Sequence, residues 1–178
     1  MHVATGVPCF TLVGLPAKSV REAEQRTRSA LLSSEQRWPP ARVVANLAPG
    51  ALRKEGTHFD LAIAMAVLAA DGRLETEPLK DWIFMGELGL DGSVRSINGV
   101  LAAAIAGRTL GRKGLVCARG NASEAAMVEG IDVIPVSTLS QCIRFFKGDW
   151  MPDPIDPSPV KRRSTSEDMS DVRGQETP

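Results

Sequence analysis

The sequence predicts an α/β (α+β) domain, in which a mixed β-sheet carries packed helices. Short apolar or β-branched runs alternate with helical stretches along most of the chain. An alanine- and leucine-rich run that ends at Ala70 predicts a helix buried nearly all round. Asp91-Gly92, between two apolar stretches, predicts a tight hairpin and so an antiparallel pair of strands.

The first half of the chain predicts two strands and two helices. A strand is expected over 9–15, and helical spacing of apolar residues predicts a surface helix over 17–33. The Trp38-Pro39-Pro40 segment breaks the chain, and β-branched residues predict a second strand over 42–47. The buried helix follows that strand after a Pro-Gly turn.

The second half continues the alternation of strands and helices. A strand over 82–90 leads through the hairpin into 93–97. An alanine-rich helix follows, closed by Gly111, and Asn121 is the expected N-cap of a later helix. The expected elements after the hairpin are the helix 100–110, the strand 114–118, the helix 121–128, the strand 131–135 and the helix 137–146.

Composition suits one globular domain followed by a polar tail. The chain has 178 residues, of which 43% are hydrophobic and 24% charged. We expect a domain over 1–148 and a proline-rich flexible linker over 149–178 without a fold of its own. The net charge is zero, so the chain lacks the overall basic character of a stand-alone nucleic-acid binder, although a local patch stays open.

Cysteine usage and hydropathy indicate a cytoplasmic protein. Cys9, Cys117 and Cys142 are an odd number in apolar settings without a C-x-x-C pair, which predicts buried free thiols and no metal site. Neither a charged-then-apolar leader nor an apolar run of about 18 residues is present, so we expect no membrane contact.

The polar turn before the buried helix is the candidate site. It contains Lys54, Glu55, Gly56 and His58, and the start of a buried helix can hold an anion or a reacting oxygen. Asp60 is most simply a helix cap. Lys54 and Glu55 either bind an anion or form a solvated turn or ion pair, with the second alternative favoured. His58 is either a base or metal ligand or, as favoured, a hydrogen-bonded turn residue.

The remaining charged candidates are a buried carboxylate and a set of arginines. Glu87 lies in an otherwise apolar strand and needs partners there, so we expect it to pair with Arg53 or Lys54, with acid–base catalysis the less favoured alternative. A nucleic-acid or partner-binding surface can be assembled from Arg42, Arg53, Lys54, Arg95 and Lys161 to Arg163. Scattered solvated arginines are the slightly favoured alternative.

Several motifs in order resemble those of a known family. They are Gly14-Leu15-Pro16, Asn46-Leu47-Ala48-Pro49, Leu52-Arg53-Lys54-Glu55-Gly56, Phe59-Asp60-Leu61, the segment Gly86 to Gly92, and Asn98-Gly99-Val100-Leu101. Over about 6–147 the chain is similar to the N-terminal domain of the magnesium-chelatase-like AAA+ ATPases of the YifB/ComM type. Asp171 to Glu176 resembles the lead-in to their ATPase module, so the resemblance implies an excised domain or a clipped gene product.

This resemblance implies where nucleotide binding and assembly occur. The chain contains no G-x-x-x-x-G-K-[ST] phosphate loop, so ATP and magnesium are expected only in the absent AAA+ module, and no cofactor in this fragment. The implied parent is an ATP-driven ring motor acting on DNA in recombination and natural transformation. Implied partners are the chain's own AAA+ module, neighbouring ring subunits, and single-stranded or branched DNA.

The family domain is also similar in fold to the Lon peptidase domain and to a ribosomal-protein domain. Matching the Lon motifs to this chain places His58 at the serine nucleophile and Leu101 at the lysine base. The resemblance therefore implies a non-catalytic accessory domain. Two alternatives stay open: a Lon-like peptidase with a displaced dyad that uses Ser96 or another serine, and a part of a metal-chelatase ATPase complex.

Overall fold

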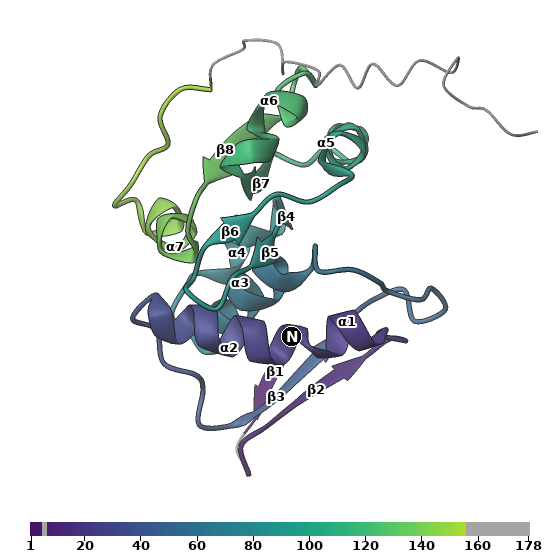
Figure 1. Ribbon diagram of the computed structural model, residues 1–178, viewed down its shortest axis with the longest axis vertical. Coiled ribbons are helices and arrows are strands. Elements are labelled where there is room, and N and C mark those ends of the chain that lie inside the picture. Colours follow the sequence, from purple (N-terminus) through teal and green to yellow (C-terminus); the bar gives the residue numbers. More distant parts are fainter. Residues whose placement is uncertain (5–6, 156–178) are drawn as a thin grey trace, which may run out of the picture.

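A computed structural model describes residues 1–4 and 7–155 and contains three small sheets and seven α-helices in the described part (Figure 1). The strands are β1 (His2–Ala4), β2 (Cys9–Val13), β3 (Arg42–Asn46), β4 (Trp82–Met85), β5 (Glu87–Leu88), β6 (Val94–Arg95), β7 (Gly114–Ala118) and β8 (Asp132–Val136). The helices are α1 (Lys18–Arg21), α2 (Ala23–Ser33), α3 (Asp60–Ala70), α4 (Thr76–Lys80), α5 (Val100–Thr109), α6 (Ala122–Ala125) and α7 (Leu139–Lys147).

The strands pair in a mixed pattern, which confirms the predicted α/β class. In the first sheet β3 lies between β1, which is antiparallel to it, and β2, which is parallel. The second sheet has the order β4-β7-β8 and is entirely parallel. The hairpin β5-β6 forms the third, with Leu88 opposite Val94, as Asp91-Gly92 predicts.

Helix α3 is the centre of the main core. It contacts α2, β1, β4 and β5, and so connects all three sheets (Figure 1). Its buried apolar side chains are Leu61, Ile63, Ala64, Met65, Val67 and Leu68. The helix is not buried nearly all round, however, because Ala62, Ala66, Ala69 and Ala70 are only half-buried.

A second, smaller core lies on the other side of the parallel sheet. Helix α5 packs there through Val100 and Ala104 against Leu115 of β7. Gly107 permits this close approach, because a Cβ atom at that position would lie 2.6 Å from the Ile83 side chain. The predicted helix over 100–110 is therefore confirmed, with a glycine at its tightest contact.

Two predicted elements are divided in the structure. The helix expected over 17–33 is split at Glu22 into α1 and α2. The strand expected over 82–90 is interrupted at Gly86, whose carbonyl accepts a hydrogen bond from the Leu61 N–H at 3.2 Å and whose N–H donates to the His58 carbonyl at 3.3 Å. Gly86 thus joins the start of α3 to the sheet instead of extending β4. Neither β1 nor α4 was anticipated.

Asn121 has a different role from the predicted one. Its side chain does not cap the short helix α6. Its Oδ1 accepts a hydrogen bond from the Ile97 N–H at 3.0 Å, and its Nδ2 donates to the Ile97 carbonyl at 2.8 Å. Asn121 therefore attaches the segment after β6 to the end of β7, a long-range contact that capping rules do not detect.

The end of the described chain remains attached to the domain. Trp150 packs against the main core, and an Arg119 nitrogen lies 2.7 Å from a carboxylate oxygen of Asp153. The boundary at 148 stays a prediction, and most of the predicted linker, including Lys161 to Arg163 and Asp171 to Glu176, lies outside the described residues.

Side-chain burial corrects one cysteine prediction. Cys117 and Cys142 are buried, and burial raises the pKa of the Cys117 thiol to about 12. Cys9 is exposed, because it begins the edge strand β2, so the prediction of a buried thiol there was wrong. No helix in the described ranges is long and apolar enough to span a bilayer.

We expect the Asn121→Ala variant to lower the free energy of unfolding by about 1–3 kcal/mol, because both Ile97 backbone groups lose their side-chain partner. Urea denaturation measures the change. Asn98→Ala, at an exposed position, is the matched control and should change stability by less than about 0.5 kcal/mol. Equal losses in the two variants would contradict the role of Asn121.

Candidate functional site at the start of helix α3

The predicted polar turn lies beyond the carboxyl ends of β2 and β3 and leads directly into α3 (Figure 1). Backbone hydrogen bonds attach it to the segment that follows β2. The Lys54 N–H donates to the Leu15 carbonyl at 3.2 Å, and the Ala17 N–H donates to the Lys54 carbonyl at 2.9 Å. The turn is therefore held in place as an extension of the first sheet.

Lys54 and Glu55 are adjacent in sequence but differ in environment. Lys54 is only 6% exposed, and its ammonium group donates to the Pro49 carbonyl. Glu55 is exposed and lies 2.9 Å from the Arg53 guanidinium. In this conformation Lys54 closes the turn, and its ammonium group is not presented to a phosphate.

Asp60 forms a buried ion pair. Arg26 of α2 donates from Nε to Oδ2 at 2.6 Å and from an Nη atom to Oδ1 at 3.0 Å. The Leu88 N–H also donates to Oδ2 at 3.3 Å, and Asp60 is fully buried. The prediction that Asp60 caps α3 was wrong, because its carboxylate connects α3 to α2 and β5 and makes no capping bond.

Asp60 and Arg26 each change the pKa of the other. Burial raises the pKa of Asp60, because a buried carboxylate loses its hydration, while the Arg26 guanidinium partly offsets this rise. The hydrogen bond that Arg26 donates to Asp60 in turn raises the pKa of Arg26. A bidentate guanidinium–carboxylate contact is the geometry that best compensates such a loss of hydration.

The other polar residues of the turn are also engaged. The Gly56 N–H donates to Ser19 Oγ at 3.1 Å, and Thr57 Oγ1 donates to Glu87 Oε2 at 2.5 Å. Arg95 approaches the other oxygen of Glu87 at 3.6 Å. The predicted pairing of Glu87 with Arg53 or Lys54 was therefore wrong, and sequence reasoning did not identify Thr57 as its partner.

His58 is a packed turn residue. Its ring centroid lies 4.0 Å from that of Phe59, and burial lowers the pKa of the imidazole. A Cβ atom on Gly56 would lie 2.9 Å from His58 Nδ1, so this histidine position requires a glycine two residues earlier. The lowered pKa favours the neutral imidazole, and the side chain is half-buried.

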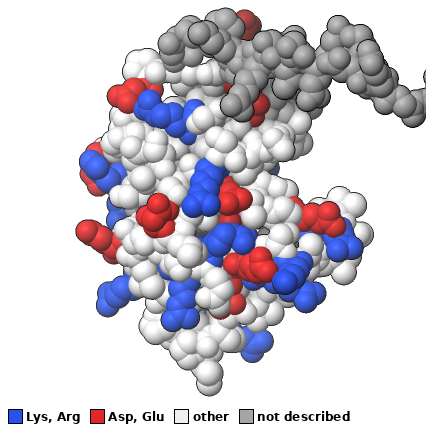
Figure 2. All heavy atoms as spheres, in the orientation of Figure 1, with Lys and Arg blue, Asp and Glu red and all other residues white. Residues whose placement is uncertain are grey.

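The structure does not gather the predicted arginines into one patch. Arg42 begins β3 and Arg53 follows its end, so the length of a five-residue strand, roughly 13 Å, separates them. Arg95 lies on the hairpin beside Glu87. Figure 2 shows acidic and basic side chains interspersed on the face in view, without a large area of one sign.

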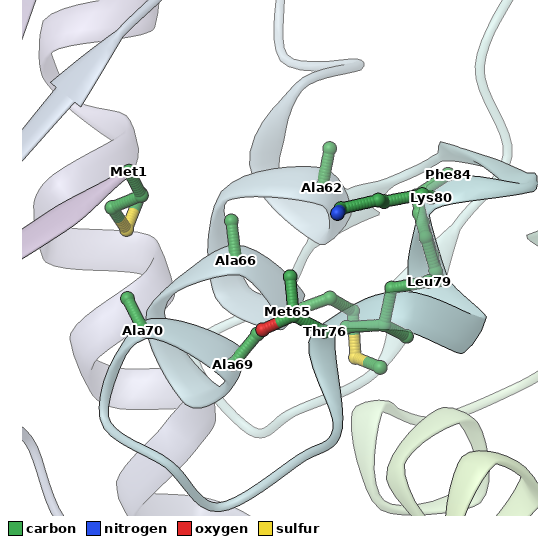
Figure 3. A pocket seen from close by; sticks show the side chains of 10 residues that line it. All are labelled: Met1, Ala62, Met65, Ala66, Ala69, Ala70, Thr76, Leu79, Lys80 and Phe84. Carbon is green, nitrogen blue, oxygen red and sulfur yellow. The ribbon is translucent and has the colours of Figure 1, made fainter.

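An apolar groove along the half-buried side of α3 is the feature that sequence reasoning missed. Two adjoining hollows of about 290 and 180 Å³ share Met1, Ala62 and Ala66. Figure 3 shows the larger of the two. Leu79 and Phe84 close one side of the larger hollow. The signal was available, because alanines recur along one face of an otherwise bulky apolar helix.

Other candidate chemistry is sparse in the part of the chain that the structure describes. No group of three or more His, Cys, Asp or Glu residues there is placed to hold a metal ion. Ser96 is exposed and lies against Gly120, where a Cβ atom would come within 2.4 Å of the Ser96 hydroxyl. Leu101 is 36% exposed on α5.

Fold and motifs agree with a family match. Residues 1–121 match the family described as "Subunit ChlI of Mg-chelatase". The chain therefore belongs to the magnesium-chelatase-like family and carries an α/β domain of that class, which confirms the resemblance seen in its motifs.

Within that family the chain is similar to proteins of the YifB/ComM type. It is 42% identical to competence protein ComM of Haemophilus influenzae over 148 residues, or 83% of this chain and 29% of that protein. It is 35% identical to YifB of Escherichia coli over 176 residues, or 99% of this chain and 35% of that protein. The chain thus spans about a third of the length of these relatives.

A more distant similarity involves a peptidase. The chain is 35% identical to an archaeal Lon protease of Methanocaldococcus jannaschii over 90 residues, which is half of this chain and 13% of that protein. This similarity accords with the α/β fold.

We expect Arg26→Met to lower the free energy of unfolding by about 3–5 kcal/mol at neutral pH, because it leaves Asp60 buried without its counter-charge. Thermal or urea unfolding measures the loss. Lys80→Met, in the exposed pair with Glu77, is the control and should cost less than about 1 kcal/mol.

The deficit of Arg26→Met should shrink as the pH falls. Burial raises the pKa of Asp60 above its ordinary value of 3.8, and loss of Arg26 raises it further. In the folded variant Asp60 then binds a proton more tightly than in the unfolded chain. The stabilisation that this protonation gives is present at acidic pH and is lost as the pH rises through the raised pKa of Asp60. A deficit that is the same at pH 4 and pH 7 would contradict this account.

Proposed function

We propose that this chain is a non-catalytic N-terminal accessory domain of a magnesium-chelatase-like AAA+ ATPase of the YifB/ComM type. The parent protein would be an ATP-driven ring motor that acts on DNA in recombination and natural transformation. The domain would contribute contacts to DNA or to neighbouring subunits of the ring. ATP and magnesium would bind in the AAA+ module, outside this chain.

The similarity to ComM carries this proposal. That protein is named for competence, and the similarity extends over 83% of this chain at 42% identity. The family description, a subunit of Mg-chelatase, supports a role within a larger assembly. The chain's span of about a third of these relatives leaves room in them for a separate motor module.

The proposed lack of catalysis rests on the residues at the Lon-type positions. His58 packs against Phe59 and has a lowered pKa, and Leu101 has no group that can accept a proton. Thr57, the hydroxyl closest to this position in sequence, donates to a carboxylate that Arg95 also approaches. This hydroxyl is engaged with Glu87, and the Lon-type position that would hold the lysine base is Leu101.

Exposed arginines are the residues proposed to contact DNA. The side chain of Arg53 is 72% exposed and that of Arg95 is 61% exposed, whereas Lys54 is withdrawn into the turn. Both arginines face a carboxylate within 4 Å, so their phosphate contacts would compete with internal pairs. Weak, salt-sensitive binding is therefore the expected mode.

The similarity to an archaeal Lon protease supports a second candidate, a peptidase with a displaced dyad. A serine-reactive fluorophosphonate probe tests it directly. Labelling of Ser96 that Ser96→Ala abolishes would favour the peptidase and contradict the accessory role.

The family description favours a third candidate, a part of a metal-chelatase ATPase complex. Co-purification with chelatase partner subunits tests it. Stable capture of those subunits by this chain would favour the chelatase role over a DNA-associated one.

We expect fluorescence-anisotropy titration with single-stranded and forked DNA to show binding that weakens at the higher of two salt concentrations. Arg53→Ala and Arg95→Ala should each lower the salt slope by about 0.7–0.9, the value for one lost phosphate contact. Lys54→Met, a buried position, should leave the slope unchanged. Absence of binding at high protein concentration would contradict the proposed DNA contact and leave contact with neighbouring subunits as the role of the domain.

A further inference from the structure

A hollow distinct from the α3 groove lies between the α2–β3 loop and the turn after α3. Its volume is about 520 Å³, and its lining residues are Arg37, Trp38, Pro40, Asp71 and Arg73. A neighbouring hollow of about 280 Å³ shares Trp38 and Pro40 and adds Arg28 and Glu24 of α2, so the positive charge of its lining is balanced. One indole ring therefore borders two adjacent hollows, each of which contains an arginine.

The loop that presents Trp38 is firmly placed. After α2 the chain reverses at Glu35, which has a φ of 59°, and the Gln36 N–H donates to the Leu31 carbonyl at 2.8 Å. Pro39 and Pro40 then restrict the backbone. The Trp38 ring packs edge-on against Phe10, with centroids 5.6 Å apart. Only part of the ring is used in packing, and it stays half-buried.

The charges around the larger hollow leave one cation available. Arg73 is held by Asp71, whose Oδ2 accepts from Nε at 2.7 Å and lies 2.6 Å from Nη2. No ion pair or hydrogen bond engages the Arg37 guanidinium within residues 1–4 and 7–155. Arg37 is exposed, so the lining has a net positive charge beside an aromatic ring.

We propose that this hollow binds a nucleotide unit, with the base stacked on Trp38 and the phosphate at Arg37. Every base has a π-face that can stack on an indole, and arginine suits phosphate through its planar, delocalised charge. A volume of 520 Å³ lies within the range of small-ligand sites, roughly 300–1,000 Å³. This site would extend the proposed DNA contact. That the bound nucleotide belongs to a DNA strand rests on the proposed function.

A further exposed arginine beside the smaller hollow supports this site. Cys9 lines the smaller hollow and is the cross-strand partner of Arg42 in the parallel β2–β3 pair. Arg42 is exposed at the start of β3, four residues after Trp38. A second phosphate can therefore be held beyond the smaller hollow. Arg53 follows the other end of β3 and Arg95 lies on the β5–β6 hairpin, so neither takes part in this site.

The base and phosphate bound at this hollow can belong either to a single strand of nucleic acid or to a free nucleotide. The experiment follows the indole N–H signals of Trp38, Trp82 and Trp150 in ¹H–¹⁵N spectra of the full chain. Trp38→Phe assigns the Trp38 signal. Thymidine monophosphate and short oligothymidylate are then titrated separately, and each titration is repeated with Arg37→Ala.

We expect the Trp38 signal to shift while those of Trp82 and Trp150 stay in place. A shift with both probes identifies a free nucleotide as a sufficient ligand, and a shift with oligothymidylate alone identifies a strand. Trp38→Leu should weaken oligothymidylate binding by about 5- to 100-fold, the range for one stacked base. Because Trp38 also packs on Phe10, the exposed Arg37→Ala serves as the second variant and should lower the salt slope by about 0.7.

Lys147→Ala removes one exposed positive charge from α7, where Lys147 lines neither hollow, and is the matched control. A Trp38 signal that neither probe shifts would overturn the proposal, as would equal weakening by Arg37→Ala and Lys147→Ala. DNA binding that survives Trp38→Leu and Arg37→Ala but is lost in Arg53→Ala and Arg95→Ala would overturn this site alone and leave the proposed function in place.

Discussion

The arrangement of the whole domain depends on the buried pair of Asp60 and Arg26. Asp60 begins the central helix α3 in a position without access to water, so its charge is tolerated only because Arg26 and the Leu88 N–H neutralise and bond it. These contacts orient α3 against α2 and the β5–β6 hairpin at once. Arg26 also donates to the Ser19 carbonyl, and Ser19 accepts from Gly56, so the pair extends to the polar turn. The ion pair therefore specifies the relative positions of these elements as well as contributing to stability.

The polar turn before α3 occupies the position of the nucleophile-bearing turn of the Lon-type fold, but its polar groups have other contacts. In the similar Lon-type fold the start of the buried helix carries the nucleophile, which must stay accessible. Here the corresponding polar groups are used internally, since Thr57 bonds Glu87, Lys54 bonds Pro49 and His58 packs on Phe59. A site whose donors and acceptors are already satisfied can hold a loop in place, whereas it has little left for a substrate. The family membership and this network of internal contacts are the grounds on which we propose a domain that acts by contact.

The surfaces available for contact lie elsewhere and differ in character. The groove beside α3 is mainly apolar and lined by alanines, with Thr76 and Lys80 at the larger hollow, so it suits a largely apolar group. The hollow beside Trp38 combines an aromatic ring with arginines, and it lies at the opposite end of β3 from the polar turn. Acidic and basic side chains are interspersed on the visible face, and the net charge is zero (Figure 2). Any binding of anions therefore depends on such local sites and not on an overall positive potential.

The sequence by itself determined the order of most strands and helices, although not β1 or α4, together with the hairpin at Asp91-Gly92, the α/β class and the family, because periodicity, turn chemistry and motifs are local properties. It also located the buried helix and the polar turn before it. Only the tertiary structure decided the partners of Asp60, Glu87, Lys54 and Asn121, since each bonds to groups that packing brings together from distant segments or from across a folded turn. Local rules predicted that Asp60 and Asn121 cap helices, because the backbone N–H groups of the following helix turn are the only partners close to them in sequence. The half-buried face of α3 and the setting of Trp38 were likewise decided by which neighbours the fold supplies, a non-local property that one sequence does not contain in readable form.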